Sequence, residues 1–100
     1  MSTYVFASEP VFHYHSYRGG TVNEVLLDPQ AVGRVIARYR AEKGLSQEVL
    51  SGLAAIGRTH LSAIERGERK PTLETLYRIS LALGVSMSAI TADIERELNA

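Results

Sequence analysis

The chain contains no cysteine and no tryptophan, and only three of its 100 residues are proline. Without cysteine, neither a disulfide framework nor a cysteine-ligated zinc site can hold the fold together. No apolar run approaches the roughly 20 residues that span a bilayer, and the N-terminus lacks the basic and apolar regions of a secretory signal. We therefore expect a cytoplasmic protein with no membrane contact, stabilised by a packed core.

Charge of one sign is not in excess either, because 11 basic residues are balanced by 11 acidic ones. The distribution is uneven, however: residues 31–70 carry a net charge of +4, and the segments before and after them carry −2 each. Phosphate binding requires a positive surface rather than a positive protein. Because an ordinary solvated surface gives the same pattern, charge alone leaves nucleic-acid binding open.

Residues 1–27 differ from the rest of the chain in composition. They hold five of the seven aromatic residues, and side-chain types alternate with a period of two from Phe12 to Tyr17, as in a strand. Gly19-Gly20 marks a break before a second possible strand at 21–27. Since two short strands are only marginally stable alone, we predict an N-terminal arm that packs on the remaining domain or on a second chain.

Residues 28–100 predict one all-α domain of five short helices. The starts carry capping signals at Asp28-Pro29, Ser46, Gly57, Thr72 and Ser86. Apolar residues at helical spacing give each helix a predicted inner face. These faces comprise Val32, Val35, Ile36 and Tyr39; Val49, Leu50, Leu53 and Ala54; Leu61 and Ile64; Leu73, Leu76, Ile79 and Leu83; and Met87, Ile90, Ile94 and Leu98. Helices this short must share one core to be stable.

The second and third predicted helices are joined only by Ala55-Ile56-Gly57. So short a link predicts the sharp angle of a helix-turn-helix, in which the second helix protrudes. With Leu61 and Ile64 turned inward, a small, polar and basic set is left to point outward or sideways: Arg58, Thr59, Ser62, Ala63 and Arg66. Such a set suits contact with base edges and phosphates.

The run from Leu45 to Ser86 resembles the XRE-type helix-turn-helix proteins, relatives of the phage repressor and Cro proteins. The resemblance covers about Val32 to Ile90 and is carried by four motifs: Leu45-Ser46-Gln47-Glu48, Ile64-Glu65-Arg66-Gly67, Lys70-Pro71-Thr72 and Leu83-Gly84-Val85. It implies a compact five-helix repressor-like domain that binds double-stranded DNA without a cofactor. It also implies a sequence-specific transcriptional regulator, a repressor acting as a homodimer on a palindromic operator.

The resemblance also implies roles for individual residues. Base reading falls to Arg58, Thr59, Ser62 and Ala63. Phosphate binding falls to Gln47, His60, Arg66, Arg69, Lys70 and Thr72. Arg40 and Glu65 would form a structural pair that fixes the recognition helix. The chain departs from the family pattern at Ala55, where glycine is common, and at Gly57, where serine or threonine is usual.

Two other classes of function compete with this interpretation. His13 and His15 lie on one face of the predicted strand and could ligate a metal, but two ligands are too few. No grouping of catalytic side chains stands out, so we expect neither a metal site nor an enzyme. The second class is an antitoxin-like interaction module that holds a protein partner through the arm. The arm and the 86–98 helix are both candidate dimer surfaces.

Overall fold

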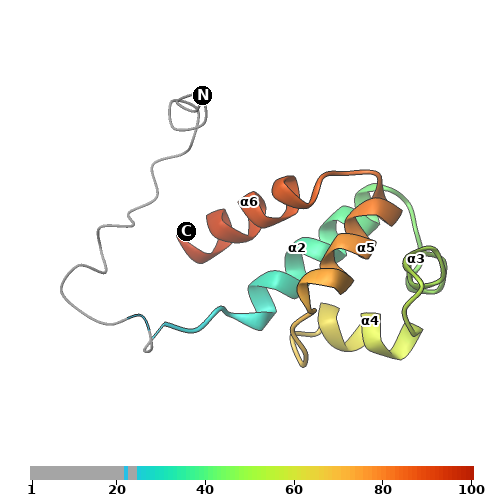
Figure 1. Ribbon diagram of the computed structural model, residues 1–100. Coiled ribbons are helices and arrows are strands. Elements are labelled where there is room, and N and C mark those ends of the chain that lie inside the picture. The colour runs from blue at the N-terminus through green and yellow to red at the C-terminus, as the bar shows by residue number, and fades with distance from the viewer. Residues whose placement is uncertain (1–21, 23–24) are drawn as a thin grey trace.

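The computed structural model of the chain describes Val22 and residues 25–100, in which five helices and no strand are found (Figure 1). The predicted all-α, five-helix class is therefore confirmed, whereas the predicted strands of the arm lie outside the described residues. The helices are α2 (Pro29–Glu42), α3 (Gln47–Ala54), α4 (Arg58–Glu65), α5 (Leu73–Leu83) and α6 (Met87–Leu98).

Each helix begins at the residue that the sequence indicates. In four of them a capping side chain accepts a hydrogen bond from a backbone N–H of the first turn, which would otherwise be unpaired. These caps are Asp28, Ser46, Thr72 and Ser86. The exception is α4, where Gly57 supplies no side-chain hydrogen bond. The helix that the sequence predicts to contact DNA is thus the one with the weakest cap.

The core lies between α2, α5 and the two short helices α3 and α4, and α6 closes it on one side (Figure 1). α2 packs against both α4 and α6, and α3 packs against α5. α2 and α6 are also joined by a polar contact, because the Tyr39 hydroxyl donates to Asp93 at 2.5 Å. This hydrogen bond raises the pKa of Tyr39 above its ordinary value. The core cluster comprises the buried residues Val32, Val35, Ile36, Leu50, Ala54, Leu61, Ile64, Leu76, Ile79, Leu83, Ile90 and Ile94.

Three residues assigned to the inner faces of α3 and α5 are instead exposed, and for these the prediction is wrong. Val49, Leu53 and Leu73 are 48%, 62% and 71% exposed. α3 and α5 bury the small residues Ser51 and Ser80 in place of larger ones. Their hydroxyls donate to backbone carbonyls of their own helices, so that both can be buried without an unpaired polar group.

The α6 stripe divides between core and surface. Ile90 and Ile94 are buried in the core, whereas Leu98 remains 40% exposed. Most of the surface that the sequence offered for dimerisation on this helix is therefore occupied by packing within the chain. Within the described part of the chain, no single helix is long and apolar enough to cross a membrane; α5 and α6 would suffice only as a pair, and a 110° bend separates them.

Candidate nucleic-acid interface

The joint between α3 and α4 turns on one residue in a left-handed backbone conformation. Ala55 has φ 58° and ψ 43°, and its N–H donates to the Gly52 carbonyl at 3.2 Å. The following N–H, of Ile56, donates to the Ser51 carbonyl at 3.0 Å. These bonds close the end of α3, and Gly57 then continues in an extended conformation into α4. Alanine adopts this left-handed conformation at a cost that glycine avoids, so the turn keeps it although the usual glycine of the family is absent.

The C-terminal end of α4 lies unusually close to α2. A Cβ atom added to Gly33 in α2 would lie 2.4 Å from the Ile64 carbonyl oxygen and 2.5 Å from that of Glu65. Gly67, with φ +78°, likewise lies against Gln30 at the start of α2. Only glycine, which has no Cβ atom, lets the two backbones approach each other this closely. The sequence signal for this crossing is a glycine inside an apolar helical pattern, from which no contact was predicted.

A partly buried polar network holds the same end of α4. Arg40 of α2 forms a two-point ion pair with Glu65, with Nε–Oε2 and Nη2–Oε1 distances of 2.7 and 2.8 Å. The Arg40 guanidinium also donates to the Leu45 carbonyl at 2.9 Å. Hydrogen bonding to Glu65, whose side chain is only 6% exposed, raises the pKa of Arg40 above its ordinary value. The structure thus brings together the two residues expected to pair.

Gln47 joins this network, which the sequence analysis did not anticipate. Its side-chain amide donates to Glu65 Oε1 at 2.9 Å, so that Glu65 links α2, α3 and α4. Gln47 is also the first residue of α3, where unpaired backbone N–H groups attract anions. Its side chain is therefore held in a fixed orientation beside a potential phosphate site.

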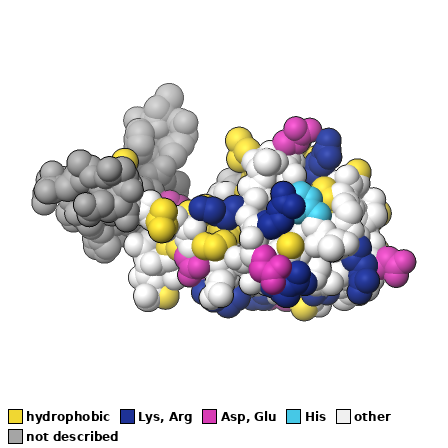
Figure 2. All heavy atoms as spheres, turned by 90° about the horizontal axis from the view of Figure 1, so that it is seen from below, with side chains coloured by type: hydrophobic (Ala, Val, Ile, Leu, Met, Phe, Trp, Pro, Cys, Tyr) yellow, Lys and Arg dark blue, Asp and Glu magenta, His cyan; other side chains and the backbone are white. Residues whose placement is uncertain are grey.

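The N-terminal half of α4 presents the exposed side chains. Arg58 and Thr59 are exposed, and His60 and Ser62 are half-buried. Figure 2 looks onto this side of the molecule, where Lys and Arg side chains surround the histidine and a few acidic side chains lie among them. Among the residues that the structure describes, Arg58, Arg69 and Lys70 form no salt bridge. Their charges are available to a ligand.

Arg66 differs from these three because it already has an acidic partner. Its guanidinium makes two hydrogen bonds of 2.9 Å to Glu68 and another to the Ser62 hydroxyl. The pairing raises the pKa of Arg66 and lowers that of Glu68 from their ordinary values. A phosphate at Arg66 would have to compete with this carboxylate. The Ser62 hydroxyl accepts a hydrogen bond from the same guanidinium.

Two of the other predicted contact residues have structural surroundings that constrain them. Ala63, which was expected to point outward or sideways, is only 9% exposed, so that little of its methyl group is accessible to a base. The Thr72 hydroxyl accepts from the Thr75 N–H at 3.0 Å and caps α5. It remains exposed at the helix start. In the part of the chain that is described, no cluster of three metal-ligating side chains occurs; His13 and His15 lie outside it.

Comparison with known proteins assigns the sequence that forms this site to a family. The family model described as Helix-turn-helix matches residues 36–90, more than half of the chain. The chain is a helix-turn-helix protein of the XRE type. This family consists of DNA-binding regulators, and residues 36–90 contain the whole of α3, the joint and α4. The resemblance stated from the sequence motifs is therefore confirmed.

Relatives of this helix-turn-helix protein carry regulatory names. It is 49% identical over 55 residues to the uncharacterized HTH-type transcriptional regulator y4dJ of Sinorhizobium fredii, covering 55% of this chain and 71% of the relative. It is 39% identical to the control protein C.MunI of a Mycoplasma species, over 65% of this chain and 89% of the relative.

Solved structures give the same result. The restriction-modification controller protein C.Esp1396I superposes with a TM-score of 0.68 at 32% identity, covering 75% of this helix-turn-helix chain and 99% of the controller. That controller has also been solved as a tetramer in complex with its natural 35 base-pair operator. C.AhdI from Aeromonas hydrophila superposes with a TM-score of 0.62 at 29% identity, over 65% and 98% of the two chains.

Proposed function

We propose that the protein is a sequence-specific transcriptional regulator, a repressor that binds an operator in double-stranded DNA with α4 in the major groove. The observation that carries the proposal is the asymmetry of α4: its C-terminal end is fixed by Gly33 and the Arg40–Glu65–Gln47 network, while Arg58 and Thr59 at its other end are exposed. A helix held this way presents side chains to base edges with little freedom.

The proposed contacts follow from which side chains are exposed and which already have an acidic partner. Arg58 and Thr59 read bases, since an exposed arginine without an acidic partner can donate two hydrogen bonds to a guanine. Ser62 lies one turn further along; its hydroxyl accepts from Arg66 and can still donate its own proton to a base. Ala63 is not included, because it is buried. The remaining cationic and polar residues bind phosphates and fix the position of the helix on the duplex: Gln47, His60, Arg66, Arg69, Lys70 and Thr72.

A homodimer is supported by an apolar stripe on α5. Leu73, Tyr77 and Leu81 recur every four residues and are all at least half exposed, and Met87 at the start of α6 lines a shallow hollow with the first two. One helix-turn-helix reads only a few base pairs, whereas two related by a two-fold axis read half-sites about 34 Å apart. We place the dimer contact on this stripe rather than on the largely buried α6 stripe.

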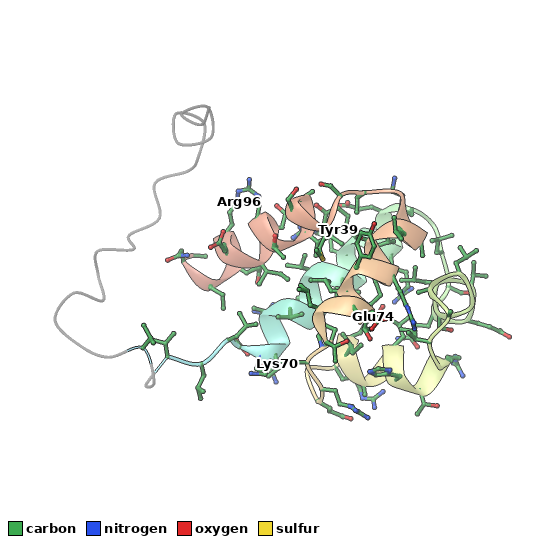
Figure 3. All side chains as sticks on the ribbon, viewed as in Figure 1. Tyr39, Lys70, Glu74 and Arg96 are labelled. Atoms are coloured by element: carbon green, nitrogen blue, oxygen red, sulfur yellow. The ribbon has the colours of Figure 1, made fainter. Side chains whose placement is uncertain are left out.

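The test is selection of binding sites from random duplex DNA at about 50 and 200 mM salt. The wild type is compared with Arg58→Ala and with Arg96→Ala, which removes another exposed arginine, from α6. Figure 3 shows Arg96 on the opposite side of the molecule from Lys70. Lys70 follows the C-terminal end of α4 by five residues. We expect the wild type and Arg96→Ala to enrich one palindromic site and Arg58→Ala to lose it while keeping salt-sensitive background binding.

Failure to enrich any site, with only weak binding that salt abolishes, would contradict the proposal. The dimer is tested separately by light scattering of Tyr77→Glu, which should halve the mass of the wild type without loss of helix. A wild-type mass of one chain, or an unchanged mass in the variant, would contradict this interface. An antitoxin-like role for the arm has no support among the described residues, so we do not favour it.

A further inference from the structure

An apolar groove lies between the start of α5 and the C-terminal half of α6, away from the exposed side chains of α4. Its volume is about 460 Å³. Buried Val32, Leu76 and Ile94 line its floor, and the exposed side chains of Leu73 and Leu98 stand at its edges. A groove of this size and composition resembles a binding site for an apolar group.

The chain itself runs past this groove. Leu27, the last but one residue before α2, is part of its lining, and the preceding Val25 and Leu26 are exposed. The sequence upstream can supply an apolar group for the groove, because five aromatic residues occur between positions 4 and 17. Tyr17 is only ten residues from Leu27, and a segment of that length spans at most about 35 Å when extended.

We propose that the groove binds an aromatic side chain of residues 12–17 from the same chain. A ligand tethered by roughly 10 to 15 residues has an effective concentration in the millimolar range, so that it competes well against any free partner. A tyrosine suits the groove better than a phenylalanine, because a buried phenol needs a hydrogen-bond partner and the groove offers polar groups. Thr91, Glu95 and Lys70 line the groove beside its apolar floor and can supply that partner.

The position of the groove gives its occupant a second effect. Lys70 and Thr72 line the groove and are also proposed phosphate contacts. A side chain bound in the groove therefore packs against residues 70–72, which are proposed to bind DNA. This consequence rests on the proposed function, whereas occupancy of the groove does not. The experiment therefore measures occupancy in the absence of DNA.

The chain has no tryptophan, so that one introduced residue reports without background. Three full-length variants, Phe12→Trp, Tyr14→Trp and Tyr17→Trp, are each tested for quenching of fluorescence by acrylamide. Each is combined with Leu98→Glu or Leu27→Glu, which place a charge at the groove from half-exposed positions. Leu53→Glu is the matched control, since Leu53 is an exposed leucine on α3 outside the groove. Circular dichroism checks that every variant retains its helices.

We expect at least one tryptophan to be shielded, to become several-fold more accessible with either groove variant, and to stay shielded with Leu53→Glu. The shielding should not depend on protein concentration. Equal quenching of all three probes with and without the groove variants would overturn the proposal. Shielding that grows with protein concentration would also overturn it, because the groove would then belong to the arm of a second copy.

Discussion

The two ends of α4 are built in opposite ways. At the C-terminal end, glycine lets two backbones touch, and an ion pair with a third hydrogen-bonded partner joins three helices. At the N-terminal end, the cap lacks a side-chain hydrogen bond and Arg58 and Thr59 are exposed. The helix is therefore anchored at one end and offers its side chains at the other. Substitutions at the two ends should affect different measurements: unfolding at the first and DNA binding at the second.

Gly33→Ala should have the largest effect on stability. The added methyl group would lie 2.4 Å from a backbone oxygen of α4, so that the two helices must separate. We expect a loss of about 3 kcal/mol or more in the free energy of unfolding, measured in urea. Gly52→Ala is the control, because a Cβ there meets nothing within 4 Å; it should be neutral or stabilising. If Gly33→Ala unfolds like the wild type, α4 is not anchored by this contact.

Glu65→Gln should come next. It removes the charge from a nearly buried side chain that holds Arg40 and Gln47, and it leaves the Arg40 charge without its partner. Because Arg40 is partly solvated, we expect about 2 kcal/mol rather than the full cost of a buried pair. A double-mutant cycle with Arg40→Ala measures the coupling. Additive losses would mean that the two residues stabilise the fold independently.

Arg58→Ala tests the opposite end of the helix. Affinity for the selected operator should fall by about 10- to 100-fold, because one two-point base contact is lost. The free energy of unfolding should stay within about 0.5 kcal/mol of the wild type, because the side chain is exposed. A variant that loses both stability and affinity would show that the N-terminal end of α4 also contributes to the stability of the fold.

Ala55→Gly should produce the smallest effect and the opposite sign. The left-handed conformation of Ala55 strains an alanine and suits a glycine. We expect the free energy of unfolding to rise by about 1 kcal/mol or less, with operator affinity unchanged, as followed by thermal melting and a binding titration. A decrease in stability would show that the Ala55 methyl group makes a contact worth more than the strain.

Much of this architecture follows from local signals in the sequence. Capping side chains placed four of the five helix starts, because a cap is decided by its own side chain and the next three residues. The Arg40–Glu65 contact was anticipated only through the family resemblance. Periodicity failed at Val49, Leu53 and Leu73, because it cannot show that α3 and α5 bury the small polar residues Ser51 and Ser80. Gln47 and Gly33 act through contacts with distant residues, which no local pattern contains.

The pair formed by Arg66 and Glu68 affects how salt should weaken operator binding. When a basic side chain meets a DNA phosphate, the phosphate releases a condensed counterion, and each such contact adds about 0.9 to the slope of log affinity against log salt. Arg66 has a carboxylate as its own counterion, so that a phosphate contact there exchanges one anion for another. We therefore expect operator binding to be less sensitive to ionic strength than the number of basic residues suggests.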